Sequence, residues 1–182
     1  MNNAIGGVEL SSVAKGLETA DAMLKTSKVE LVLSRSICPG KYFVLVAGDV
    51  ADVTSSVEAG AGTAAHALVD SFVIPSVHPE VFPALSGTVV VNELEALGII
   101  ESFSVSALIE AADAAVKAAS VRLIEIRIAM ALGGRAFASF TGSVAAVETG
   151  VNAGASVISK KGLLVEKVVI PQPRQELLKE MI

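Results

Sequence analysis

The chain has 182 residues with a formal net charge of −5, and 52% of its residues are hydrophobic although only 4% are aromatic. This acidic balance without a basic run argues against a nucleic-acid-binding surface, and charged residues recur too often to leave the roughly 20 apolar residues that a membrane-spanning helix needs. The single cysteine excludes an intramolecular disulfide, and we expect a cytoplasmic protein because Met1–Ala4 does not begin a secretory signal.

Hydrophobic periodicity predicts a strand, a helix, two more strands, a second helix and a last strand in the first half of the chain. These elements are the strand Ala4–Leu10, the helix Val13–Lys25, the strands Val29–Ile37 and Tyr42–Val46, a helix from Asp49 to about Leu68, and the strand Val69–Ile74. Asp49 is expected to cap the second helix, and Pro75 to end the last strand. Gly60 and Gly62 inside the second helix indicate close packing.

The second half of the chain predicts the same order of elements. They are the strand Ala96–Ser102, the helix Val105–Ala118, the strands Val121–Met130 and Arg135–Gly142, the helix Val144–Ser159, the strand Gly162–Ile170, and a tail helix after Pro173. The order β-α-β-β-α-β gives a four-stranded antiparallel sheet with helices on one face, as in ferredoxin-like folds. We therefore predict an α+β chain with two such domains, at residues 4–85 and 96–182.

Short sequence matches identify the two halves as a tandem duplication. Ala4–Glu9 matches Ala96–Glu101 with a shift of 92 residues (96 − 4), whereas Gly40-Lys41 matches Gly134-Arg135 with a shift of 94 (134 − 40). The second copy therefore has two extra residues close to this turn. One copy of roughly 85 residues would be marginally stable alone, so we expect the copies to pair and three chains to close a ring of six similar domains.

The segment Ser36–Lys41 is a predicted turn between two strands, and it contains the only cysteine of the chain. Pro39 and Gly40 favour a turn, which places Cys38 at the tip of a loop and not in a core. A lone cysteine is more often an inert structural thiol, and one thiolate cannot hold zinc or an iron–sulfur cluster, which need three or four ligands. A functional role therefore requires symmetry to bring several copies of Cys38 together.

Four short motifs of the first copy have counterparts in the second. They are a Gly-x-x-Glu strand that includes Glu9, an Ala-Asp-Ala-x-x-Lys helix that includes Lys25, a Gly40-Lys41 turn followed by Gly-Asp-Val, and a Val-Ile-Pro strand end at Pro75. Together they resemble the bacterial microcompartment (BMC) shell domain, in two tandem, unpermuted copies over about residues 4–182. The cysteine turn resembles a branch of this family from propanediol-utilisation compartments. The resemblance implies a non-enzymatic trimer, shaped as a pseudohexagonal disc that tiles into the facets of a polyhedral shell.

The resemblance further implies that the turn between the second and third strands of each copy lines a central pore. The pore residues would be Ser36, Ile37, Cys38, Pro39, Gly40 and Lys41 in the first copy, and Ala131, Leu132, Gly133 and Gly134 in the second. It also implies that Cys38 from each of three chains holds one [4Fe-4S] cluster per trimer, for electron transfer or cluster delivery across the shell. The second turn has no equivalent ligand. Lys41 either influences the charge of the thiol and cluster or is an ordinary hairpin lysine.

Lys25, Lys117 and Arg174 match edge residues through which discs of this family pack laterally against other BMC shell proteins. Without the resemblance, each lysine would be an ordinary solvated residue near a helix end. A further expected partner is an encapsulated or cytosolic redox enzyme, with no nucleic acid and no membrane. Two alternatives stay open: a cluster-free shell protein whose central pore passes small metabolites, and a soluble trimeric ligand-binding or regulatory protein.

Overall fold

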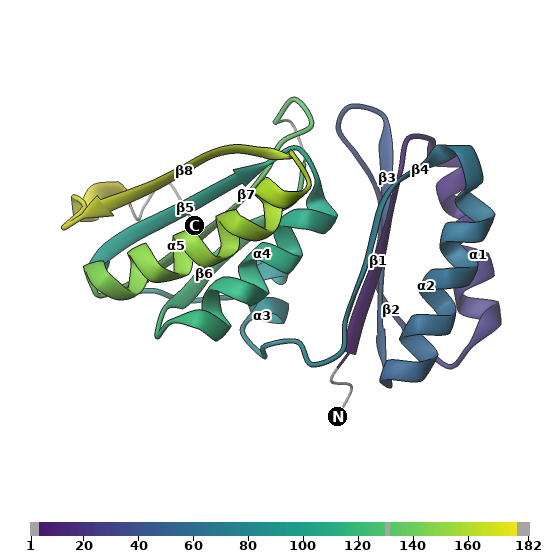
Figure 1. Cartoon of the computed structure of the whole chain (residues 1–182), viewed down its shortest axis with the longest axis horizontal. Coiled ribbons are helices and arrows are strands. Elements are labelled where there is room, and N and C mark those ends of the chain that lie inside the picture. The colour runs from purple at the N-terminus through teal and green to yellow at the C-terminus, as the bar shows by residue number, and fades with distance from the viewer. Residues whose placement is uncertain (1–3, 130–131, 178–182) are drawn as a thin grey trace. The chain divides into compact units, whose positions relative to one another are not determined.

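The computed structural model describes residues 4–129 and 132–177. They form two compact units, the first of residues 4–77 with 132–134 and the second of residues 78–129 with 135–177. The first unit contains β1 (Ala4–Leu10), α1 (Val13–Thr26), β2 (Glu30–Ile37), β3 (Lys41–Gly48), α2 (Val50–Ala64), the short 3₁₀ helix η1 (Ala65–Ala67) and β4 (Leu68–Ile74). Its four strands form an antiparallel sheet in the order β2-β3-β1-β4. Helices α1 and α2 pack side by side on one face of this sheet (Figure 1).

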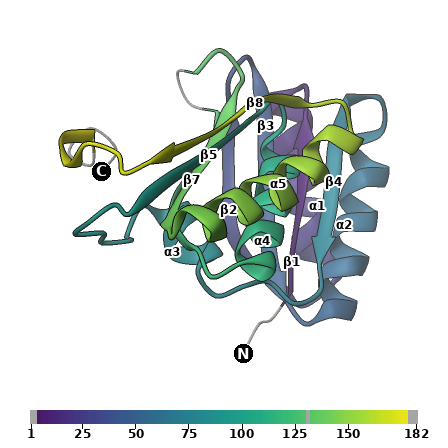
Figure 2. The same cartoon turned by 60° about the vertical axis from the view of Figure 1, so that its left-hand side comes forward.

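The second unit repeats this architecture. It contains α3 (Val81–Ser86), β5 (Ala96–Ser102), α4 (Val105–Ala118), β6 (Arg122–Arg127), β7 (Ala136–Gly142), α5 (Val144–Lys160), β8 (Leu164–Pro171) and the short 3₁₀ helix η2 (Gln175–Leu177). Its strand order, β6-β7-β5-β8, is that of the first sheet. Figure 2 shows α4 and α5 side by side over the second sheet. The predicted pair of antiparallel four-stranded sheets, each with helices on one face, is therefore confirmed.

The two sheets also share their register. Glu9 pairs with Phe43 in the first sheet, and the equivalent Glu101 pairs with Phe137 in the second. Each edge strand β2 and β6 carries an irregularity at the same repeat position, after Leu31 and after Leu123. A slip of one residue would turn every side chain of a strand to the other face of the sheet, so the shared register keeps the same repeat positions on the same face.

The core of the first unit lies between its sheet and its helices. Val8, Val44 and Met23 are fully buried within it. A Cβ at Gly60 of α2 would lie 2.7 Å from Met23 Cγ, whereas one at Gly62 would meet nothing within 4 Å. The expected close packing therefore holds for the first of these glycines and not for the second.

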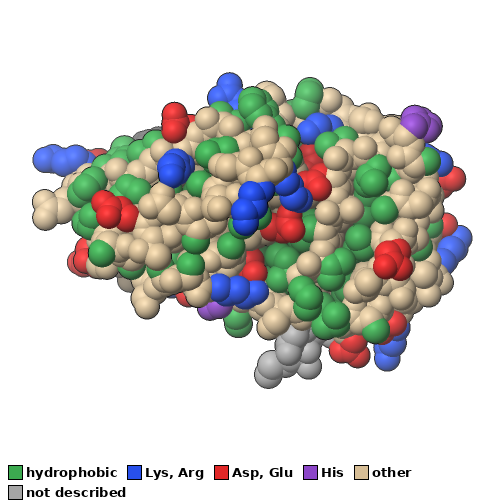
Figure 3. Space-filling model, viewed as in Figure 1, with side chains coloured by type: hydrophobic (Ala, Val, Ile, Leu, Met, Phe, Trp, Pro, Cys, Tyr) green, Lys and Arg blue, Asp and Glu red, His purple; other side chains and the backbone are tan. Residues whose placement is uncertain are grey.

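The ends of α2 differ from the prediction. Asp49 occupies the N-cap position, but its exposed carboxylate makes no cap hydrogen bond. The helix ends at Ala64 and does not continue to Leu68, because Ala65 takes a φ of 50° and a short 3₁₀ turn follows. Within the part of the chain that the structure describes, no helix has the length and apolar character needed to cross a membrane. Figure 3 shows acidic and basic side chains interspersed with apolar ones on one face of the molecule.

Candidate functional site

The turn between β2 and β3 presents the single cysteine. Cys38, Pro39 and Gly40 form the turn, and Ile37 pairs with Lys41 across its base. Gly40 has a φ of 76°, a left-handed conformation that glycine adopts without steric cost. Cys38 is half-buried with a free thiol, and the two residues after it are exposed. The hairpin therefore holds one thiol at its tip, as the sequence predicts.

Lys41 at the base of this turn is held by a carboxylate. Its Nζ lies 2.9 Å from Oε1 of Glu9, whose side chain is only 1% exposed. The repeat-equivalent pair, Arg135 and Glu101, is more exposed and longer, at 3.4 Å. Breaking a buried ion pair leaves an uncompensated charge, which is strongly destabilising. Both glutamates thus pair with a cation beside the turn of their repeat.

The second turn, between β6 and β7, offers no ligand side chain among its described residues. Leu132 is half-buried, and Gly133 and Gly134 have φ values of 61° and 84°. Ala131, also assigned to the second turn, lies outside the described residues. Two successive left-handed residues require glycine, so this turn is shaped by backbone geometry and not by side-chain chemistry.

The three residues assigned to disc edges lie near the ends of helices and strands. Lys25 and Lys117 occupy the last turns of α1 and α4, and each is paired with the aspartate four residues earlier, at 2.6 Å and 2.5 Å respectively. Arg174 follows β8, and its side chain is 84% exposed while pairing with Glu176. The exposed pairs of Lys25 and Arg174 contribute little to stability.

A single chain cannot complete a metal centre from its described residues. Within residues 4–129 and 132–177, no three His, Cys, Asp or Glu side chains lie close enough to hold a metal ion. A [4Fe-4S] cluster fits this donor set only if several chains each contribute the thiolate of Cys38. Cys38 lies at the tip of a turn and not inside a core, so its thiol is placed where thiols of other chains can approach it.

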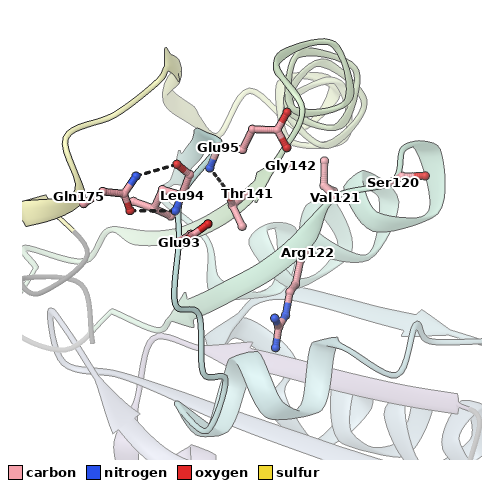
Figure 4. A pocket seen from close by; sticks show the side chains of 9 residues that line it. All are labelled: Glu93, Leu94, Glu95, Ser120, Val121, Arg122, Thr141, Gly142 and Gln175. Atoms are coloured by element: carbon pink, nitrogen blue, oxygen red, sulfur yellow. Dashed lines mark hydrogen bonds between the residues drawn. The ribbon is translucent and has the colours of Figure 1, made fainter.

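A pocket that the sequence does not predict lies in the second unit (Figure 4). It is lined by Glu93, Leu94, Glu95, Ser120, Val121, Arg122, Thr141, Gly142 and Gln175. The amide of Gln175 both accepts from the backbone N–H of Leu94, at 3.1 Å, and donates to its carbonyl oxygen, at 2.9 Å. These residues are 81 positions apart, and no local sequence pattern reports such a contact. The two hydrogen bonds fix the start of η2 against the second unit.

One buried carboxyl group was also missed from the sequence. Glu125 of β6 is buried, and its Oε2 pairs with Arg127 at 2.9 Å, whereas its Oε1 has no hydrogen-bond partner among the described residues. Burial raises the pKa of the Glu125 carboxyl, and the nearby Arg127 guanidinium only partly offsets this. Arg127 also lies over the ring of Phe137, 5.7 Å from its centroid. The first repeat has Leu33 at the position of Glu125 (125 − 92), so the repeat gave no signal for this group.

Comparison with known proteins identifies the family. The BMC domain model matches residues 4–77 and 96–173. The chain is 42% identical to the bacterial microcompartment shell protein PduT of Citrobacter freundii, over 100% of this chain and 99% of that protein. It is also 44% identical over 84 residues to the shell protein EutM of Salmonella typhimurium, covering 46% of this chain and 85% of EutM.

Solved structures agree with this assignment. The crystal structure of a microcompartments protein from Desulfitobacterium hafniense superposes with a TM-score of 0.89 at 50% identity, covering 98% of this chain and 99% of that one. The fused permuted hexameric shell protein MSM0275 matches with a TM-score of 0.65 at 18% identity, over 86% of this chain and 83% of that one, which shows the fold alone. The chain therefore belongs to the BMC domain family of microcompartment shell proteins, with two tandem copies of the domain.

Proposed function

We propose that three copies of this shell protein form a pseudohexameric trimer in a microcompartment facet, with one [4Fe-4S] cluster held by the three Cys38 thiolates at its central pore. The cluster serves electron transfer or cluster delivery across the shell. The observation that carries the proposal is the position of Cys38, a half-buried free thiol at the tip of the β2–β3 turn. The 42% identity to a shell protein over the whole chain supports the structural part.

Exposed apolar side chains support association. Leu17 and Leu24, two turns apart on one face of α1, are 57% and 40% exposed. A group of exposed apolar side chains on one face is consistent with a surface that associates with a partner. A chain of two similar domains joined head to tail can close a ring when its outer surfaces resemble its internal ones. Three chains then give six domains.

The chemistry of the turn suits a shared cluster. Three thiolates can ligate three irons of a cubane, and a bound cluster would supply one-electron transfer. Gly40 and Lys41 carry backbone N–H groups that can donate hydrogen bonds toward sulfur, whereas Pro39 has none. The ammonium group of Lys41 is held by Glu9, which favours a structural role for this lysine.

Lateral contacts complete the proposed role. Lys25, Lys117 and Arg174 would pack against other BMC shell proteins at the edges of the disc, and a redox enzyme inside or outside the shell would exchange electrons or clusters with the pore. A second candidate function is a cluster-free pore for small metabolites. It is favoured by the fact that the described residues of one chain offer the cluster a single thiolate.

Anaerobic purification followed by iron and absorption analysis tests the proposal. The parent protein should bind about four irons per three chains, with a broad visible absorption that bleaches on reduction. Cys38→Ser should abolish both signals together while leaving the association state unchanged, because a hydroxyl is a poor ligand for iron in a sulfide cubane. Ser36→Ala, in β2 two residues before Cys38, is the matched control and should retain the cluster.

Two outcomes would contradict the cluster. One is an absorption that persists in Cys38→Ser, and the other is about one iron per chain in the parent. A parent that sediments as a trimer but carries no iron after reconstitution would support the metabolite pore instead.

A further inference from the structure

The edge of the second sheet is closed by the segment that follows the first repeat. Helix α3 packs against β6 and α4, and its Val81 is fully buried. Just before it, Oε2 of Glu80 accepts the backbone N–H of Leu123 at 2.9 Å. The backbone N–H of His78 donates to Oδ1 of Asp113 at 2.8 Å. Two hydrogen bonds to carboxylates and one apolar anchor thus attach this segment to an edge strand and to a helix.

The covered positions of this edge are buried. Leu123 is 0% exposed, and Asp113, whose other oxygen pairs with Lys117, is also buried. An uncovered edge strand presents backbone groups that can pair with another chain, and proteins commonly cover such edges with a helix or loop. The segment from His78 to α3 performs this task for β6.

The first repeat has residues equivalent to Leu123 and Asp113, but no described segment of the chain packs over them. A shift of 92 residues places Leu31 of β2 at the position of Leu123, and Asp21 of α1 at the position of Asp113. Leu31 is 46% exposed, and the side chain of Asp21 is 62% exposed. Oδ2 of Asp21 pairs with Lys25, in the way that Oδ2 of Asp113 pairs with Lys117. Both repeats therefore carry this surface, and among the residues that the structure describes a segment covers it in the second repeat only.

The covering segment also has a counterpart, which follows the second repeat. The shift between the repeats is 96 residues here (171 − 75). Arg174 is therefore equivalent to His78, Glu176 to Glu80 and Leu177 to Val81. All three are exposed. Gln175 ties the start of this segment to Leu94 of its own unit (Figure 4). A hydrogen bond from Arg174 lowers the pKa of Glu176, which keeps its carboxylate ionised as an acceptor.

We infer that residues 174–177 of one copy dock on α1 and the β2 edge of a second copy of this chain. Glu176 accepts the backbone N–H of Leu31, Asp21 accepts the backbone N–H of Arg174, and Leu177 packs over the exposed Leu31. The arrangement of α3 on β6 is the template for each of these contacts.

We call this contact of residues 174–177 with α1 and β2 of a second copy the clasp. It rests on the proposed function and adds to it the contact that joins successive chains. It is a heterologous contact between two different surfaces, and such contacts generate rings when the rotation closes. The carboxylate of Glu176 has about four acceptor positions on its two oxygens. It can therefore retain its hydrogen bonds from Arg174 while it accepts the backbone N–H of Leu31 from the second copy.

Cross-linking in the Cys38→Ser background tests the contact directly. Chains carrying Leu31→Cys are mixed with chains carrying Leu177→Cys, and a short bismaleimide is added. We expect covalent dimers in the mixture and only monomers with either chain alone. The negative control pairs Leu31→Cys chains with Val90→Cys chains, whose exposed residue has no place in the clasp.

Sedimentation equilibrium of point variants measures the contribution of the contact. Glu176→Ala should weaken association about tenfold or more, as expected for the loss of a charge-assisted hydrogen bond. Glu166→Ala is the matched control, because this exposed carboxylate of β8 accepts the neighbouring backbone N–H of Lys167 and has no part in the proposed contact. It should leave association unchanged.

The outcomes separate the clasp from the proposed function. A protein that sediments as a trimer yet gives no cross-link between positions 31 and 177, and whose Glu176→Ala variant associates like the parent, overturns the clasp and leaves the trimer standing. A parent that sediments as a monomer overturns both. Cross-linking together with weaker association of Glu176→Ala supports the clasp, whether or not the sample contains iron.

Discussion

The two repeats share strand order and register, yet equivalent residues have different surroundings. Glu9 is buried with Lys41, whereas Glu101 and Arg135 form a longer, partly exposed pair. Leu123 is covered by the chain that follows the first repeat, whereas Leu31 is exposed. The duplication thus preserved the backbone, and the environment of each position then diverged. Each repeat provides a matched control for a substitution in the other.

The largest difference in stability loss between equivalent substitutions is expected for a phenylalanine in the third strand of each repeat. Phe43 is fully buried, and the equivalent Phe137 is half-buried beneath Arg127. Phe43→Ala should lower the free energy of unfolding by about 3–5 kcal/mol, and Phe137→Ala by roughly half as much, because less apolar area is lost. Urea unfolding of the two variants measures the difference. Equal losses would show that the exposure difference has no energetic consequence.

A smaller contrast is expected for the glycine at which the two helices of each unit approach. A Cβ at Gly154 of α5 would lie 2.7 Å from the carbonyl oxygen of Ala111, which is backbone, whereas one at Gly60 of α2 would meet the flexible side chain of Met23. Gly154→Ala should therefore cost about 1–3 kcal/mol of stability. At Gly60, alanine's better helix propensity of about 1 kcal/mol should offset most of the crowding. Thermal unfolding midpoints measure both, and a larger shift for Gly60→Ala would contradict the packing argument.

The smallest effect is expected at Glu125, where the first repeat carries Leu33. The pKa of Glu125 is raised mainly by burial, so the unfolded chain releases this proton first as the pH rises. The contribution of Glu125 to stability therefore falls as the pH rises above the usual glutamate range, until the carboxyl ionises in the folded state as well. Glu125→Leu should remove this dependence and change stability at neutral pH by about 1 kcal/mol or less, toward higher stability. Unfolding measured between pH 4 and pH 8 checks the slope, which should persist in the Arg122→Ala control.

Local patterns predicted the elements well, because strand alternation, helical periodicity and turn residues act over a few positions. β1, β5 and α4 have the predicted bounds, and α1 ends one residue later than expected. The repeat then gave the sheet topology twice, so each half supported the other. The position of Cys38 in a turn also followed from its neighbours, whereas the cluster stays a prediction, since it depends on symmetry between chains.

Long-range contacts were beyond the reach of these patterns. The hydrogen bond of Glu80 to Leu123 spans 43 positions, and that of Gln175 to Leu94 spans 81. Both involve a side chain and a backbone group, which leave no mark on hydrophobic periodicity. The burial of Glu125 was missed for a related reason, because a charged residue in a strand predicts an exposed face and here a neighbouring arginine accompanies it inside.

The difference between the two turns has an evolutionary consequence. In a ring built from a chain with one repeat, a substitution in the turn appears at every position around the axis. In a ring of chains with two repeats it appears at alternate positions only. The turn of Cys38 and the glycine turn at Gly133 and Gly134 can therefore be selected independently. In the proposed ring, a single codon change in the turn of Cys38 would alter the number of thiols around the axis and leave the turn of the other repeat unchanged.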